Sequence, residues 1–280
     1  MITGVAFCPQ APALVPEVAN TLTAGFVYRP EWLRNFTLAV DWYRIRIANA
    51  ITSISGTDPT VQNICINSGG TSPFCDFYVG RPLGPTNRDP SNIPQLILSQ
   101  PFNTAYNKTT GVDAELTYHT EAPTIIGDRG GFDLRALVSY QPSLKRQTLP
   151  GAVITDAAGA TGLAEWRVNV TLGYTSGPLQ MSVMERWHSK ENQSADPTLV
   201  FTQGPIPAIA YTDLSFSYRF GGSGTEKPLQ LFLNIENVFN KQPTLALGPG
   251  LATSPGFSYP APLDQDVIGR YFTAGVRARF

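Results

Sequence analysis

The residues best suited to chemistry are two cysteines, Cys65 and Cys75, on either side of a short stretch that contains Gly, Ser and Pro. In an oxidising compartment a disulfide between them would close a small loop and contribute about 2–3 kcal/mol of stability. The alternative is a pair of unrelated thiols. No histidine or further cysteine flanks them, so we predict no metal site there. Cys8 is left over and is expected to pair, if at all, with a residue upstream.

The two histidines, His119 and His188, fall near the ends of predicted strands. The strand order described below places them at opposite ends of the sheet, so we expect polar wall residues and not a shared site. No Gly-x-Ser-x-Gly element holds a serine nucleophile on a sharp turn. Gly248-Pro-Gly250 lacks the lysine and helix of a phosphate loop. We therefore predict no catalytic residue, no metal, no cofactor and no enzymatic activity.

Charged side chains alternate along two neighbouring segments. Asp113 and Glu115 lie on one face of the first segment, and Asp133 and Arg135 share a face of the second. General acid–base catalysis could use such groups around a substrate, but their regular spacing favours a charged wall that lines an interior. To the same wall we assign Arg277 and Arg279, near the end of the sequence.

The elements that must position these side chains alternate apolar and polar residues with a period of two, as strands with two unlike faces do. In the last segment one face holds Phe272, Ala274, Val276, Ala278 and Phe280, and the other holds Tyr271, Thr273, Gly275, Arg277 and Arg279. About nine strands are predicted in this way, at 22–28, 36–47, 112–119, 132–140, 166–174, 179–187, 212–220, 229–237 and 271–280.

Strand length and aromatic placement favour a membrane barrel over a soluble sandwich. Strands of about nine to twelve residues suit a tilted crossing of a bilayer, whereas soluble strands centre on about 5–6. Aromatic residues stand at both ends of several apolar faces, in the pairs Phe132 and Tyr140, Trp166 and Tyr174, and Phe272 and Phe280. Such rings form the girdles of a lipid-facing band. We therefore predict an all-β fold, an antiparallel transmembrane β-barrel.

Composition supports this class and excludes others. Charged residues are 15% of the sequence, against about 25% in a soluble domain. The net charge of −1 leaves no basic field for nucleic acid. No apolar run is long enough for a transmembrane helix, and residues 1–10 do not resemble a secretory signal. For a protein placed outside the cytoplasm, this leads us to expect a piece of a longer product.

The connections between the predicted strands alternate strictly between short and long. The short links are 29–35, 120–131, 176–178 and 221–228, and the long ones are 48–106, 141–165, 188–210 and 238–270. Outer-membrane barrels have short periplasmic turns and long extracellular loops. An open sheet would expose unpaired backbone groups at each edge, at several kcal/mol per group in hydrocarbon. We therefore expect a partial barrel, completed by strands from an N-terminal portion.

Four stretches carry a resemblance to a known family. The end, Asp266-Val-Ile-Gly-Arg-Tyr-Phe-Thr-Ala-Gly-Val-Arg-Ala-Arg-Phe280, is similar to the last strand of TonB-dependent receptors. Three others resemble further elements of that family, in the family's order: Leu14-Val-Pro-Glu17, Thr109-Thr-Gly-Val-Asp-Ala-Glu115 and Asn234-Ile-Glu-Asn-Val-Phe-Asn-Lys241. The last strand also resembles the signal read by the barrel-assembly machinery, with Thr273, Gly275, Ala278 and Phe280 in its places.

The resemblance implies a plugged barrel of about 22 strands in the bacterial outer membrane, with a periplasmic C-terminus. Residues 1–280 would be its C-terminal portion, without the plug and the N-terminal strands. The implied activity is energised uptake of a scarce ligand such as a siderophore, with TonB acting through the plug. The implied partners are outer-membrane lipids and the barrel-assembly machinery, and the wall residues above would face the lumen.

Two other functions stay open. A passive porin-like channel shares the barrel but has no upstream plug sequence. A soluble β-sandwich binding module would be a stable monomer without detergent. The sequence does not identify the transported ligand, because specificity in this family depends on plug apices and on all extracellular loops together.

Overall fold

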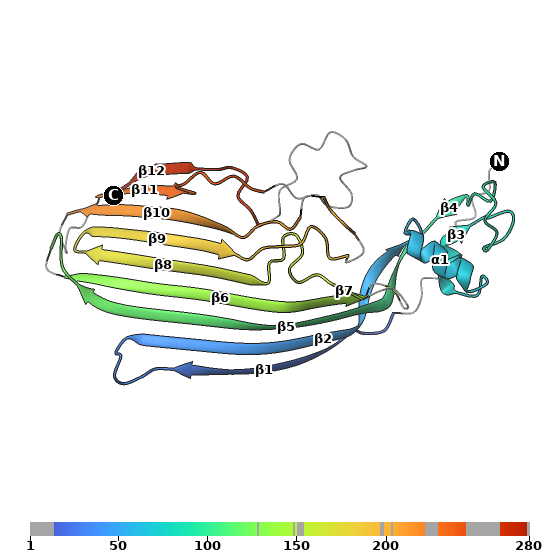
Figure 1. Ribbon diagram of the computed structural model, residues 1–280, viewed down its shortest axis with the longest axis horizontal. Coiled ribbons are helices and arrows are strands. Elements are labelled where there is room, and N and C mark those ends of the chain that lie inside the picture. Colours follow the sequence, from blue (N-terminus) through green and yellow to red (C-terminus); the bar gives the residue numbers. More distant parts are fainter. Residues whose placement is uncertain are drawn as a thin grey trace. The chain divides into compact units, whose positions relative to one another are not determined.

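The computed structural model describes residues 14–127, 129–147, 149, 154–196, 199–202, 204–221, 229–244 and 264–278. Antiparallel strands dominate it (Figure 1). The long strands are β1 (Val18–Tyr28), β2 (Phe36–Ser55), β5 (Ser99–Ala122), β6 (Gly130–Gln147), β8 (Trp166–Ser176), β9 (Leu179–His188), β10 (Ile209–Phe220), β11 (Leu229–Glu236) and β12 (Tyr271–Ala278). They pair in chain order, and the short strand β7 (Thr155–Asp156) pairs with β6. The predicted all-β meander of about nine strands is confirmed.

The chain divides into two compact units. Unit 1 takes residues up to 20, then 46–108 and 145–154, and unit 2 takes 21–45, 109–144 and 155–280. Strands β1, β2, β5 and β6 each contribute residues to both units. No helix among the described residues is both long and apolar enough to cross a bilayer.

One face of the unit 2 sheet is apolar across six strands. A single cross-strand row runs Leu134, Leu172, Val183, Leu214, Ile235 and Phe272, from β6 to β12. Because side chains alternate along every strand, the side to which this row points determines the side to which every other row of the sheet points. We call this side of the sheet the apolar face. Several of its side chains are exposed, among them Phe272 at 58% and Val183 at 42%.

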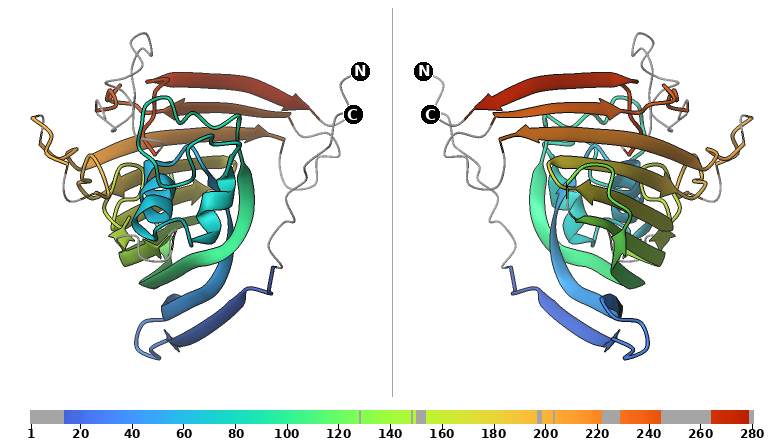
Figure 2. Two further views of the ribbon diagram at one scale, coloured as in Figure 1. Left: turned by 90° about the vertical axis from the view of Figure 1, so that its right-hand side faces the viewer. Right: turned by 90° about the vertical axis from the view of Figure 1, so that its left-hand side faces the viewer.

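The adjacent row points to the opposite side and is polar. It runs Asp133, Gly173, Ser182, Ser215, Asn234 and Thr273 across the same six strands. We call this side the polar face. The wall of unit 2 is curved and its sheet is open, as a partial barrel (Figure 2).

Aromatic pairs stand near both ends of the apolar face where β6 meets β8. The rings of Phe132 and Tyr174 lie 5.0 Å apart at one end, and those of Tyr140 and Trp166 stack at 4.1 Å at the other. The two pairs are about 27 Å apart along the strand, from a rise of about 3.4 Å per residue. At the tilt of about 35–45° that barrel strands have, this corresponds to roughly 20 Å across the membrane, close to the apolar band of about 25 Å between two girdles.

The links between the strands keep the predicted alternation. Residues 29–35, 123–129, 177–178 and 221–228 form short links, while 56–98, 148–165, 189–208 and 237–270 form long ones. Because consecutive strands are antiparallel, short links and long links join opposite ends of the strands.

Unit 1 differs from the sequence-based prediction, which left residues 48–106 as a loop. Strands β2 and β5 extend into this region, and it also holds helix α1 (Pro59–Asn67), the 3-10 helix η1 (Pro73–Phe77) and the short strands β3 (Tyr78–Val79) and β4 (Leu96–Ile97). Helix α1 begins with Asp58 as its N-cap, whose side chain accepts a hydrogen bond from Thr60 N at 2.8 Å. Pro59 follows in the first helical turn, where its missing N–H costs nothing.

A small core holds unit 1 together. The rings of Phe74, Phe77 and Phe102 lie 5.4–5.8 Å apart in pairs. Val61 and Cys65, from the inner side of α1, are fully buried in the same cluster. A disulfide joins Cys65 to Cys75 and so connects α1 to η1.

Candidate functional site

A cross-strand ion pair and a histidine–carboxylate hydrogen bond lie on the polar face between β5 and β6. Arg135 Nε lies 2.9 Å from Glu115 Oε1, and His119 Nδ1 lies 2.8 Å from Asp133 Oδ1. All four side chains are about half exposed. The structure therefore brings the sequence-predicted wall residues Glu115, Asp133 and Arg135 together as pairs that face an open space.

Two hollows lie on the polar face, each with a volume of about 420 Å³. Asp113, Glu115 and Arg167 line one of them, and Arg277 lines the other together with serine and amide side chains of β9, β10 and β11. Arg279, the remaining predicted wall residue, lies outside the described residues. The polar face thus offers charged and hydrogen-bonding groups with room in front of them.

An ion pair whose carboxylate is buried ties β9 to β10. Arg186 donates to Asp213 from Nε at 2.8 Å and from Nη2 at 3.3 Å. Asp213 also accepts the backbone N–H of Asn237 at 2.8 Å. The Arg186 guanidinium lies over the ring of Tyr211, 5.6 Å from its centroid. Asp213 is 9% exposed, so this carboxylate is held almost entirely by protein groups.

Asn237 organises the turn that follows β11. It is 1% exposed and has a left-handed backbone, with φ 49°. Its amide donates to Lys241 O and its carbonyl accepts from Lys241 N, at 2.9 and 2.8 Å. A second turn residue, Asn240, accepts from Arg270 N at 3.0 Å. The Asn-Val-Phe-Asn and Gly-Arg elements noted in the sequence therefore meet at the start of β12.

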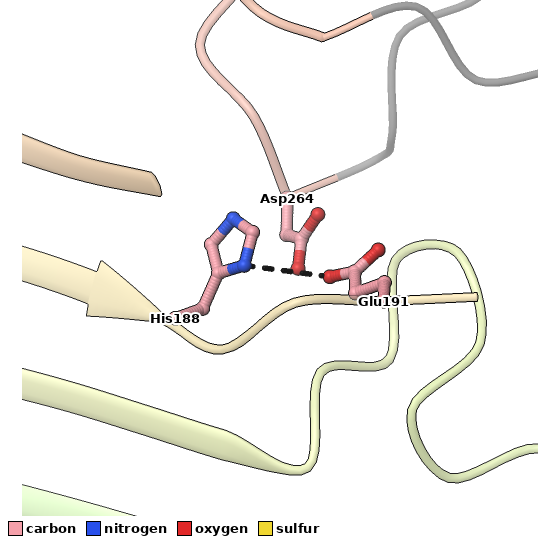
Figure 3. Close-up of side chains that lie close together, drawn as sticks. All are labelled: His188, Glu191 and Asp264. Atoms are coloured by element: carbon pink, nitrogen blue, oxygen red, sulfur yellow. Dashed lines mark ion pairs between the residues drawn. The ribbon is translucent and has the colours of Figure 1, made fainter. Parts of the chain in front are cut away.

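Three ligand-type side chains converge among the long links (Figure 3). His188 ends β9, Glu191 lies three residues on in the β9–β10 link, and Asp264 precedes β12. One ligand atom from each lies within 4.8 Å of the other two. We call these three residues the rim cluster.

Burial dominates the electrostatics of the rim cluster. Glu191 is 1% exposed, and burial, together with the neighbouring Asp264 carboxyl, raises the pKa of Glu191 to about 8. Glu191 Oε2 accepts from Gly162 N at 2.7 Å, and Oε1 lies 3.5 Å from His188 Nδ1. Arg167 Nη2 lies 3.9 Å from Asp264 Oδ2 and donates to Gly162 O at 2.9 Å.

The residues predicted as an assembly signal lie on β12, except for Phe280, which falls outside the described residues. Thr273 pairs with Asn234 and Gly275 pairs with Phe232 across β11 and β12, and Ala278 pairs with Leu229. A Cβ on Gly275 would lie 2.6 Å from the ring of Phe232, so the missing side chain makes room for that ring. Cys8, whose partner was sought upstream, also lies outside the described residues.

Sequence reasoning treated His188 only as a wall residue and did not single out Glu191 or Asp264. His188 and Glu191 are three residues apart, which is a weak local signal for a shared site. Strands β10 and β11 separate Asp264 from Glu191 in the sequence, so no residue spacing indicates that Asp264 belongs to the cluster.

Together, these features define a class: an open antiparallel meander with one apolar and one polar face is part of the wall of a β-barrel. A family model described as "TonB dependent receptor-like, beta-barrel" matches residues 3–238. The chain belongs to this family, as its sequence motifs indicated. Barrels of the family are bacterial outer-membrane proteins, and the family is one of receptors and transporters and not a class of enzymes.

Solved structures share the fold. Two crystal structures of mutants of the ferric enterobactin receptor of Pseudomonas aeruginosa align over 95% of this chain and 32% of theirs, with a TM-score of 0.53 and 13% identity. At this identity the likeness shows the fold alone. This chain thus spans about a third of the length of the receptors it matches. The comparison with curated proteins found no match.

Proposed function

We propose that residues 1–280 form the C-terminal wall of a TonB-dependent outer-membrane transporter that takes up a scarce ligand such as a siderophore. The register carries this proposal, because it sorts apolar and polar side chains onto opposite faces across six strands. An apolar outer band and a polar interior are what a barrel in lipid requires. The siderophore class is supported by the fold shared with a ferric enterobactin receptor.

The partition of links supports an orientation. Long links belong on the extracellular side of outer-membrane barrels and short ones on the periplasmic side. With this orientation β12 ends in the periplasm, and Thr273, Gly275, Ala278 and Phe280 are available to the barrel-assembly machinery. The rest of the protein would supply the remaining strands and the plug. The strands would pair with the open edges of the sheet, and the plug would face the charged side chains of the polar face. TonB would act through that plug.

Uptake in the bacterium that carries the gene tests the proposal. Cells without the gene, starved of iron, should lose accumulation of at least one iron-loaded siderophore, and a TonB-deficient strain should show the same loss. Entry of small solutes that needs no TonB would indicate a passive channel instead. Recovery of the protein as a monomer from the aqueous fraction, without detergent, would indicate a soluble binding module.

A further inference from the structure

We propose that the rim cluster of His188, Glu191 and Asp264 is a binding site for a divalent transition-metal ion of the Zn²⁺ class. Nothing in the barrel architecture or in the uptake proposed above requires such a site, so the two proposals are independent. None of its three residues belongs to the charge pairs between β5 and β6 described above.

The carboxylate of Glu191 is the observation that points to a ligand. Its side chain has no solvent exposure, and its Oε1 has no hydrogen-bond partner among the described residues. That oxygen points at His188 and Asp264 (Figure 3). Both oxygens of Asp264 are also buried and receive no hydrogen bond from any described residue. A buried carboxylate without a donor costs several kcal/mol unless a cation or a proton satisfies it.

Protein cations do not complete the cluster. The Arg167 guanidinium lies beside the cluster, but its Nη2 stands 3.9 Å from Asp264, beyond hydrogen-bond length, and donates to Gly162 O. His188 Nδ1 lies 3.0 Å from Ser189 O and 3.5 Å from Glu191 Oε1. When Glu191 and Asp264 are both ionised, as metal ligation requires, one arginine and a neutral imidazole leave one buried negative charge without a counter-ion.

The donor set selects the metal. One imidazole nitrogen and two carboxylate oxygens suit Zn²⁺, Mn²⁺ or a similar ion, whereas Ca²⁺ and Mg²⁺ prefer oxygen ligands alone. Three protein ligands are the usual number where zinc keeps a fourth position open. The carbonyl of Ser189, beside His188 Nδ1, adds an oxygen that could take that position.

Such an ion would join the three long links of unit 2. Asp264 belongs to the β11–β12 link and Glu191 to the β9–β10 link. Glu191 also pairs with Ile206 through two backbone hydrogen bonds of 2.9 and 2.8 Å, and it accepts from Gly162 in the β6–β8 link. One ion would therefore fix three segments that meet at the same end of the strands.

Metal binding by the purified full-length protein tests the site. After chelator treatment in detergent, we expect one Zn²⁺ per molecule by calorimetry and elemental analysis, and much weaker binding of Ca²⁺. His188→Gln, Glu191→Gln and Asp264→Asn should each weaken Zn²⁺ binding by at least about 100-fold, because each removes a direct ligand. The matched control is His119→Gln, which alters the other histidine–carboxylate pair of the polar face and should leave Zn²⁺ affinity unchanged.

Two further measurements cover the case in which a variant does not fold. Heat-modifiable electrophoretic mobility reports whether each variant is a folded barrel. If one is not, X-ray absorption at the zinc edge of the wild-type protein should show a single histidine in a shell of oxygen ligands. No stoichiometric Zn²⁺ binding, equal binding by wild type and rim variants, or a shell with two histidines would overturn the proposal. If no Zn²⁺ binds, the carboxyl groups of Glu191 and Asp264 share a proton instead.

Discussion

At the residue scale, the two kinds of charge pair on the polar face differ mainly in burial. Asp213 is nearly buried and holds both Arg186 and the Asn237 N–H, while Asp133 and its partner His119 are more than half exposed. Water can replace a lost partner in the second pair and not in the first.

This contrast gives a prediction for Asp213→Asn. The substitution leaves Arg186 and the Asn237 N–H with a weaker acceptor, and it should lower the free energy of unfolding by about 1–3 kcal/mol. The exposed control, Asp133→Asn, should cost about 0–1 kcal/mol. Urea unfolding of the full-length barrel in vesicles, followed by tryptophan fluorescence, measures both. Equal costs would contradict the role given to burial.

Asn237 combines a left-handed backbone with buried side-chain hydrogen bonds, and a matched substitution separates the two. Glycine tolerates positive φ, so Asn237→Gly removes only the hydrogen bonds and should cost about 1–3 kcal/mol in the same unfolding assay. Asn35 has a similar φ of 61° but is exposed. We expect Asn35→Gly to change stability by only a few tenths of a kcal/mol. A comparable loss at both positions would show that turn flexibility, and not the hydrogen bonds, controls stability.

At the element scale, the strands of unit 2 were predictable because their alternation is local. Trp166 to Tyr174 shows its two faces in the sequence, and each residue pairs with its neighbours as that pattern requires. Strand β5 begins at Ser99, well before the predicted start at 112. The sequence did not indicate this earlier part of the strand, because residues such as Pro101, Asn103 and Thr104 do not alternate between apolar and polar. Its length comes from pairing with other strands, which no local pattern reports.

The helix in unit 1 was missed although its start was visible. Asp58 followed by Pro59 is a recognised N-terminal signal, but the long stretch between strands was treated as a loop. The rim cluster could not be found in this way, because Asp264 reaches Glu191 only through the fold. Local sequence signals can therefore indicate strands and helices, whereas contacts between links that are distant in the sequence are seen only in the structure.

The pair of β11 and β12 gives an element-scale prediction. Gly275→Ala places a Cβ against the ring of Phe232 and should lower stability by about 1–3 kcal/mol, because the ring must move. In a double-mutant cycle, Phe232→Ala should remove most of that cost, with a coupling energy of about 0.5–3 kcal/mol. If Gly275 served only the assembly machinery, Gly275→Ala would slow insertion in cells and leave the equilibrium stability unchanged.

At the scale of the whole molecule, the two faces of the sheet are the feature that the proposed membrane location depends on. Rows of apolar side chains are exposed across β6 to β12, which a soluble monomer rarely tolerates as one continuous patch. Within the described residues, β1 and β12 each pair with one neighbour only. Open edges in hydrocarbon would cost several kcal/mol for every unpaired backbone group. A stable membrane form therefore requires further strands, or further copies, along both edges.

Val183 and Ser182 test the assignment of the two faces within a single strand. Both lie near the middle of β9, Val183 in the apolar row and Ser182 in the polar row. Val183→Arg should destabilise the full-length barrel in vesicles by about 2–4 kcal/mol, because the guanidinium would enter the lipid band. Ser182→Arg would lie on the polar face beside Gly173 and Ser215, at the edge of one of the hollows, and should stay within about 0.5 kcal/mol of wild type. Unfolding in lipid vesicles measures the two costs, and the reverse order would place the apolar face inside a core.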